Sequence, residues 1–260
     1  MKLNKLAASL IAVSALAFGS SAQAINVGGV VWNPDDAIFD FSATSNLFET
    51  IGVNVGDSFS GYGQITSINA SGAFCPTCQL TYEFGGFTLV DAATGPADLD
   101  FAASGGWLKV YVQDTGGVID GPFTAFDANI KSSATDGTLW LDLLASSAVF
   151  GAPVTLIGSV TIPNSNGTSG QGDGYFDVVG GLAAANLDTN SQEAGTDLTY
   201  TSSFQPLNGP VINDDVVVAT HFGTNEVFGE SVTVPEPATL ALLGLGLVGL
   251  GMARRTKKAA

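Results

Sequence analysis

The chain has 260 residues, with 33 glycines, 10 prolines and only 12% charged residues, a composition that favours strands and tight turns over long helices. Its apolar residues, 45% of the total, are enough for a folded core and argue against a disordered chain. A formal charge of −16 repels nucleic acid, so we expect no nucleic-acid partner.

Residues 1–24 have the three parts of a secretory signal peptide. A short basic start precedes an apolar stretch at 6–18, and the small residues Ala22 and Ala24 then flank a glutamine. The alternative, a membrane anchor, fits less well because the apolar stretch is shorter than the roughly 20 residues that span a bilayer. We expect cleavage after Ala24, a mature chain that begins at Ile25, and folding outside the cytoplasm, where disulfides persist.

Residues 25–230 are predicted to form one β domain. In the segment LTYEF, for example, Leu80, Tyr82 and Phe84 face one way and the polar residues between them the other. Without a βαβ rhythm, such strands predict an antiparallel β-sandwich resembling a jelly roll. Strand-like windows bounded by turn residues occur at 27–32, 80–84, 107–114, 153–162, 174–179, 197–204 and 215–222. The pattern allows short helical interruptions at 44–51 and 126–133, neither of them strongly periodic, and a long surface loop is expected at 163–174.

The segment CPTC contains both cysteines, Cys75 and Cys78. A thioredoxin-like redox motif would open a helix, whereas the residues after Cys78 resemble a strand. We therefore favour a structural disulfide that fixes a turn, with redox chemistry, free thiols or metal binding as alternatives. Zinc fits poorly, because it requires four ligands and the chain adds only one histidine to the two cysteines.

The chain offers few candidates for catalytic chemistry. His221, the single histidine, lies in a strand-like apolar segment with no nucleophile elbow nearby, so we predict no catalytic residues. A pair of carboxylates of the glycosidase type remains open, because only its spacing in space defines it. Between Ile25 and Val234, 2 basic and 23 acidic residues give a net charge of −21. Local acidic pairs at 35–36, 98–100, 173–177 and 214–215 leave weak Ca²⁺ binding possible, although solvated turn aspartates are the simpler interpretation and we expect no cofactor.

The tail at 231–260 has three consecutive parts. Pro235, Glu236 and Pro237 form an extended hinge, because both prolines disfavour helix. Residues 238–253 are almost wholly apolar and, as a helix, reach the lower limit of a transmembrane span. A basic cluster at 254–258 follows, which keeps the C-terminal end in the cytoplasm according to the positive-inside rule.

This tail resembles the PEP-CTERM sorting signal of exported proteins in Gram-negative bacteria that make exopolysaccharide. Residues 235–237 match the signature tripeptide, 238–253 its transmembrane helix, and Arg254 and Arg255 its basic stop. The resemblance implies recognition by an exosortase, which removes the tail, rather than a permanent anchor. It says nothing about the domain at 25–230.

Together these features predict an exported protein, held in the inner membrane as a precursor and then delivered to the envelope, outer surface or extracellular matrix. We expect the domain to have a structural or binding role and not to be an enzyme. The alternative is a module that binds or processes exopolysaccharide, as many β-sandwiches do. A cleft with paired carboxylates or exposed aromatic residues would favour that alternative.

Overall fold

The computed structural model describes residues 24–34, 40–93, 99–114, 130–161, 168–213 and 216–234. Short helices occur at α2 (Ile130–Thr135) and α3 (Ala184–Leu187), with one 3₁₀ turn at η1 (Glu193–Gly195). The strands are β1 (Ile25–Val27), β2 (Val30–Trp32), β3 (Phe41–Thr50), β4 (Ser58–Ile68), β5 (Cys78–Asp91), β6 (Asp100–Asp114), β7 (Thr138–Ala145), β8 (Val154–Val160), β9 (Gly170–Gly180), β10 (Leu198–Asn213) and β11 (Val216–Gly229).

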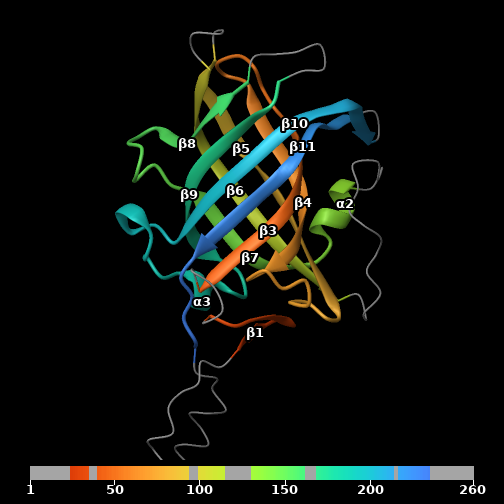
Figure 1. Ribbon diagram of the computed structural model, residues 1–260, viewed down its shortest axis with the longest axis vertical. Coiled ribbons are helices and arrows are strands. Elements are labelled where there is room, and N and C mark those ends of the chain that lie inside the picture. The colour runs from red at the N-terminus through yellow and green to blue at the C-terminus, as the bar shows by residue number, and fades with distance from the viewer. Residues whose placement is uncertain are drawn as a thin grey trace, which may run out of the picture.

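Strands β3 to β11 form one antiparallel sheet that closes on itself (Figure 1). The order is β10-β11-β3-β4-β5-β6-β7-β9-β8, and β9 also pairs with β10. Strand β8 fills the space between β6 and β9 beyond the end of β7, because it pairs with both. The predicted antiparallel β fold is confirmed, but its strands belong to one closed sheet and not to the two packed sheets of a sandwich.

Closure follows from the long strand β10, which has a partner on each edge. Its first half, Leu198–Phe204, pairs with β9 on one side and with β11 on the other. Backbone groups on both edges are thereby satisfied, so that this part of the sheet has no free edge. The inside of the closed sheet becomes the core, and alternate residues of each strand point into it.

The alternation predicted for β5 is confirmed. Leu80, Tyr82 and Phe84 are buried inside the sheet. On the outer face, Thr81 is also buried, because α2 covers it and its Oγ1 donates a 2.9 Å hydrogen bond to the carbonyl of Ala134. The same inward pattern holds in β6, where the aliphatic residues 108, 110 and 112 are buried.

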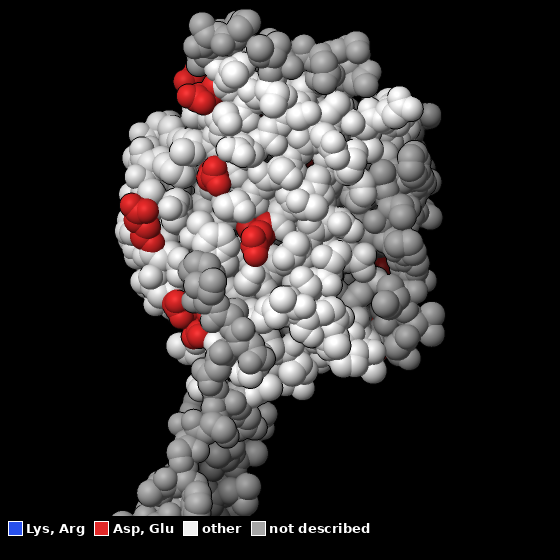
Figure 2. Space-filling view, in the orientation of Figure 1, with Lys and Arg blue, Asp and Glu red and all other residues white. Residues whose placement is uncertain are grey.

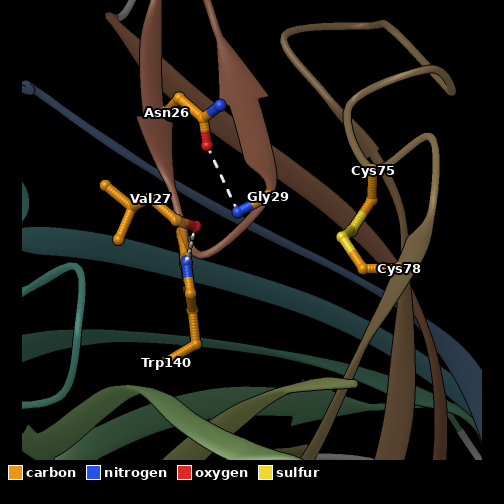
Figure 3. Close-up of a disulfide and its surroundings, with 6 residues drawn as sticks. All are labelled: Asn26, Val27, Gly29, Cys75, Cys78 and Trp140. Carbon is orange, nitrogen blue, oxygen red and sulfur yellow. Dashed lines mark hydrogen bonds between the residues drawn. A yellow bond between two sulfur atoms is a disulfide. The ribbon is translucent and has the colours of Figure 1, made fainter. Parts of the chain in front are cut away.

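The β1–β2 hairpin lies at one end of the closed sheet, at the bottom of Figure 1. Trp32 and Trp140, the tryptophan cluster, belong to the core at this end. Trp32 packs edge-on against Phe41 and Trp140, with ring centroids 5.6 and 6.0 Å away. The indole Nε1 of Trp140 donates a 3.0 Å hydrogen bond to the carbonyl of Val27 in the hairpin (Figure 3). This packing closes the lower end with apolar surface while satisfying the indole.

Several predicted boundaries differ from the structure. The window 44–51, for which the sequence allows a helical interruption, lies mainly in β3. The strand period is hard to recognise in the sequence, because the polar Ser45 and Glu49 share the inner face with Leu47. At 126–133, the described part from 130 onward belongs to α2. Strand β9 already begins at Gly170, inside the expected loop 163–174.

The C-terminal segment remains in contact with the domain after β11. Ser231 Oγ accepts a 3.2 Å hydrogen bond from the Trp32 indole, and Val232 exchanges two hydrogen bonds with Asn186. These hydrogen bonds hold residues 231 and 232 against the folded domain. No helix within the described ranges is long and apolar enough to cross a membrane. The predicted signal helix and the transmembrane segment 238–253 lie outside those ranges.

Candidate functional site

The closed sheet contains a cavity of about 300 Å³ in the half opposite the tryptophan cluster. It lies between the ends of β3, β5 and β8 and the beginnings of β4, β6 and β9. The polar residues in its lining include Glu49, Thr168 and Ser202. The rest of the wall is mainly apolar and includes six phenylalanines: Phe59, Phe84, Phe87, Phe101, Phe176 and Phe204.

Glycines on the inner face of β4 leave room for the aromatic rings of the neighbouring strand β5. A Cβ atom at Gly61 would lie 2.6 Å from Phe84 Cε1, and one at Gly63 would lie 2.1 Å from Tyr82 Cζ. Only glycine at these two positions of β4 allows the rings of β5 to lie across the neighbouring strand. The cavity wall also includes Gly172 of β9, which contributes no side chain.

The aromatic side chains of the lining pack against one another in separate groups. Phe59 and Phe87 stack with their centroids 5.1 Å apart and planes 5° from parallel. Phe84 meets Phe87 edge-on at 6.3 Å, and Phe176 meets Tyr200 edge-on at 5.7 Å. Such mutual packing fixes the rings in place, so the cavity has a defined, largely apolar surface.

Glu49 is the acidic residue among the described residues of this lining. It lies on the inner face of β3 with a 5% exposed side chain, and its Oε1 has no hydrogen-bond partner within the described part of the chain. Burial raises the pKa of Glu49 to about 8, because ionisation in an apolar cavity is unfavourable. At neutral pH its carboxyl group is therefore mainly uncharged and carries a proton that can be donated.

Polar groups continue along the inner face of β3. The hydroxyl of Ser45 donates a 3.2 Å hydrogen bond to Tyr82 Oη, which in turn donates at 2.8 Å to the carbonyl of Asn46. Asn225, opposite Ser45 on β11, is buried, and its Oδ1 lacks a partner among the described residues. Burial raises the pKa of Tyr82 and of Tyr200, so both phenols stay protonated.

His221 lies directly opposite Glu49 in the ladder between β11 and β3. Its Nδ1 is 2.8 Å from Thr220 Oγ1, and its ring packs edge-on against Phe204 with centroids 5.9 Å apart. Burial lowers the pKa of His221, which favours the neutral imidazole. The histidine thus supports the cavity wall from behind Phe204 and does not itself appear in the lining.

Sequence reasoning did not identify Glu49 or the aromatic cavity. The available signal was the inner-face period Ser45, Leu47, Glu49, in which an acidic residue occupies a position expected to be apolar. The phenylalanines are far apart in the sequence, and only closure of the sheet brings them together.

Cys75 and Cys78 lie at bonding distance and form a disulfide across a turn, with Cα atoms 5.0 Å apart (Figure 3). Cys78 begins a strand, not a helix, so the helix N-terminus that activates a thioredoxin-type thiol is absent at this turn. The preceding residue Phe74 accepts a 2.7 Å hydrogen bond from the backbone of Val31. The turn therefore lies beside the hairpin that closes the lower end.

The acidic residues do not form a metal centre within the described ranges, where no group of three or more His, Cys, Asp or Glu side chains is suitably placed. Figure 2 shows them as separate residues on the displayed face. Of the predicted acidic pairs, only 173–177 lies wholly within these ranges, on β9. The expectation of no cofactor, with weak Ca²⁺ binding as its alternative, stays a prediction.

Asp197 has a structural role that the sequence did not reveal. This buried carboxylate accepts hydrogen bonds from the backbone amides of Val178, Thr189 and Asn190 at 2.6 to 2.7 Å. It joins the segment before β10 to β9 and to the turn after α3. A buried charge that receives three backbone donors is well compensated.

The predicted processing sites lie at the two ends of the domain. Ile25, expected at the mature N-terminus, begins β1, pairs with Trp32 and is 6% exposed, whereas Ala24 is exposed. Ala22 lies outside the described residues, as do all members of the predicted sorting signal: Pro235, Glu236, Pro237, Arg254 and Arg255.

Comparison with known proteins identifies one family, and only at the C-terminal end. A model of the PEP-CTERM protein-sorting motif matches residues 233–255. No curated protein and no solved structure matches the chain. The chain therefore carries a PEP-CTERM sorting motif, which indicates a secreted, exosortase-processed protein of the cell envelope.

Proposed function

We propose that this exosortase-processed protein is a binding protein of the cell surface or extracellular matrix, and that its domain holds a small, mainly apolar molecule inside the closed sheet. The observation that carries the proposal is the cavity of about 300 Å³ with its six phenylalanines. Binding, and not catalysis, is the role we assign to it.

The size of the cavity supports this role. Its volume is at the lower end of the range typical of ligand sites and about twice that of an engineered 150 Å³ cavity that binds benzene. A ligand with two fused rings, or an aliphatic body of similar volume, fits such a space. Transfer of that body from water to the phenylalanine wall supplies the driving force.

Binding or processing of exopolysaccharide is the second candidate and has less support. Sugar rings present many hydroxyl groups, each of which requires a polar partner when it is buried. Among the described residues, the cavity lining offers few such partners beyond Glu49, Thr168, Tyr200 and Ser202. A polysaccharide chain would also have to pass through a closed sheet, whereas a small molecule has only to enter it.

The proposal can be tested with a fluorescent apolar probe and one pair of variants. Exported protein, purified without detergent, is titrated with N-phenylnaphthylamine, whose emission rises in apolar sites. We expect saturable binding at one site per chain. Ser202→Phe places a ring in the cavity and should abolish binding, whereas Ser203→Phe on the outer face of the same strand should not.

Circular dichroism melting curves establish that both variants are folded. If the wild-type protein fails to bind the probe, or if Ser202→Phe is folded and binds it as well as the wild type, the proposed function is wrong.

A further inference from the structure

Orphaned polar atoms gather on two neighbouring strands of the closed sheet. Within the described part of the chain, the buried side-chain atoms without a hydrogen-bond partner are Glu49 Oε1, His221 Nε2 and Asn225 Oδ1. All three residues lie on β3 or β11, and Glu49 and His221 are direct partners in the ladder. Because a buried polar group without a partner costs free energy, such a group calls for an explanation.

Of the three, Glu49 is the one that lines the cavity. Ser45 and Leu47 precede it on the same inner face, so the strand period directs its carboxyl group inward. The titratable groups that face or influence it from neighbouring strands are His221, Tyr82 and Tyr200. The phenols and the neutral imidazole supply no positive charge to balance a carboxylate, which agrees with the pKa of about 8.

We infer that the cavity is built for an uncharged, mainly apolar molecule with one hydrogen-bond acceptor, a carbonyl or hydroxyl oxygen, and that the carboxyl group of Glu49 donates a hydrogen bond to this oxygen. This inference rests on the proposed function and adds the chemical class of the ligand. It explains why an acidic residue is kept among phenylalanines: the ligand supplies the partner that the protein does not.

Charged ligands fit the same cavity less well. An anion is repelled by the net charge of −21 between Ile25 and Val234. Inside the cavity it meets no cationic group among the described residues of the lining. A cation would have to lose its hydration in an apolar cavity, and its attraction to one carboxylate repays that cost only with excellent geometry and further hydrogen bonds. A neutral ligand with a hydrogen-bond acceptor binds to the protonated Glu49 without the desolvation of any charged group.

Four naphthalenes with one substituent at the same ring position separate these cases: acetylnaphthalene as neutral acceptor, ethylnaphthalene as hydrocarbon, naphthoate as anion and naphthylmethylamine as cation. Their affinities for the exported protein are measured by isothermal titration calorimetry at pH 6.5. We expect acetylnaphthalene to bind about tenfold more tightly than ethylnaphthalene, which is the effect of one net hydrogen bond. Both ions should bind more weakly than the hydrocarbon.

Variants of Glu49 assign the difference to its carboxyl group. In Glu49→Leu the advantage of the acetyl compound should vanish while ethylnaphthalene still binds, so the second probe shows that the cavity is intact. Glu226→Leu, the same replacement on the outer face of β11, should keep the full advantage. In the wild type, the advantage should decline above about pH 8, where Glu49 loses its proton.

The outcomes distinguish the two proposals. Equal binding of acetyl- and ethylnaphthalene would leave the proposed function intact and overturn this inference. Tightest binding of the amine or of the naphthoate would also overturn it, because Glu49 would then act as a counterion or as a partner for an acid. If none of the four compounds binds, the proposed function itself fails.

Discussion

Glu49 on β3 and His221 on β11 are direct partners across the ladder, yet each retains an unpartnered polar atom among the described residues. The histidine turns its Nδ1 to Thr220, and its ring supports Phe204 from behind. Glu49 is left facing an apolar cavity with its carboxyl group protonated at neutral pH. This arrangement links the fold to the proposed ligand, because it places a protonated carboxyl group in a wall that consists mainly of phenylalanines.

The first prediction concerns the pH dependence of stability. The folded state binds the Glu49 proton more tightly than the unfolded chain does, with a pKa of about 8 against 4.5. The resulting stabilisation is complete below pH 4.5, declines as the pH rises towards 8, and levels off above that value. Relative to Glu49→Gln, the wild-type free energy of unfolding should therefore fall by up to ~1.4 kcal/mol per pH unit in this window.

Urea unfolding of both proteins at several pH values between 4 and 9 measures this difference. Glu49→Gln is the suitable reference, because it keeps the size of the side chain and removes its titration. A constant difference across the range would mean that Glu49 titrates with the same pKa in the folded and unfolded states.

A second prediction concerns Asp197, which accepts three backbone hydrogen bonds. Asp197→Ala leaves the amides of Val178, Thr189 and Asn190 without this acceptor, so the free energy of unfolding should fall by about 3 kcal/mol or more. Thermal or urea unfolding measures the change. The exposed Asp188 is the matched control, and its replacement by alanine should cost less than about 0.5 kcal/mol. Similar losses for the two variants would refute the role of Asp197.

The disulfide between Cys75 and Cys78 gives a third prediction. Its loop is short, so the double variant Cys75→Ser/Cys78→Ser should lose only about 2 kcal/mol of stability and remain folded. Thiol titration of unreduced, denatured wild-type protein should find no free cysteine. Two reactive thiols in that experiment would show that the bridge does not form in the cell.

The sorting tail gives a fourth prediction, which separates exosortase processing from permanent anchoring. If an exosortase reads Pro235, Glu236 and Pro237, exchange of these residues for alanine should leave full-length precursor in the inner membrane. Val232→Ala, upstream of the tripeptide, is the control and should be processed normally. Mass spectrometry of surface or released protein determines its C-terminus. Recovery of wild-type protein that still contains Lys257 and Lys258 would argue for an anchor.

The strands with a clear period of two were predictable from the sequence. Leu80, Tyr82 and Phe84 alternate with polar residues, and the predicted window 80–84 lies within β5. The window 44–51, for which the sequence allows a helical interruption, lies mainly in β3, and its period of two is hidden because Ser45 and Glu49 occupy inner positions that an apolar pattern would fill. Polar residues that face a cavity remove the signal by which a half-buried strand is recognised.

Closure of the sheet and the cavity were not predictable in the same way. In the pairing of β9 with β10, Gly170 lies opposite Phe204. No local sequence pattern predicts a contact between residues so far apart in the chain. A sandwich and a closed sheet require the same alternation in each strand, so the two differ only in which edges meet. Without closure, Phe59 and Phe204 have no reason to share one wall.

A crystal structure of the exported protein with acetylnaphthalene bound would show directly where the ligand lies. We expect the naphthalene rings inside the closed sheet against Phe59, Phe87 and Phe204, with the carbonyl oxygen within about 3 Å of a Glu49 carboxyl oxygen. Rings bound on the outer surface, or bound inside with the carbonyl directed away from Glu49, would contradict this expectation.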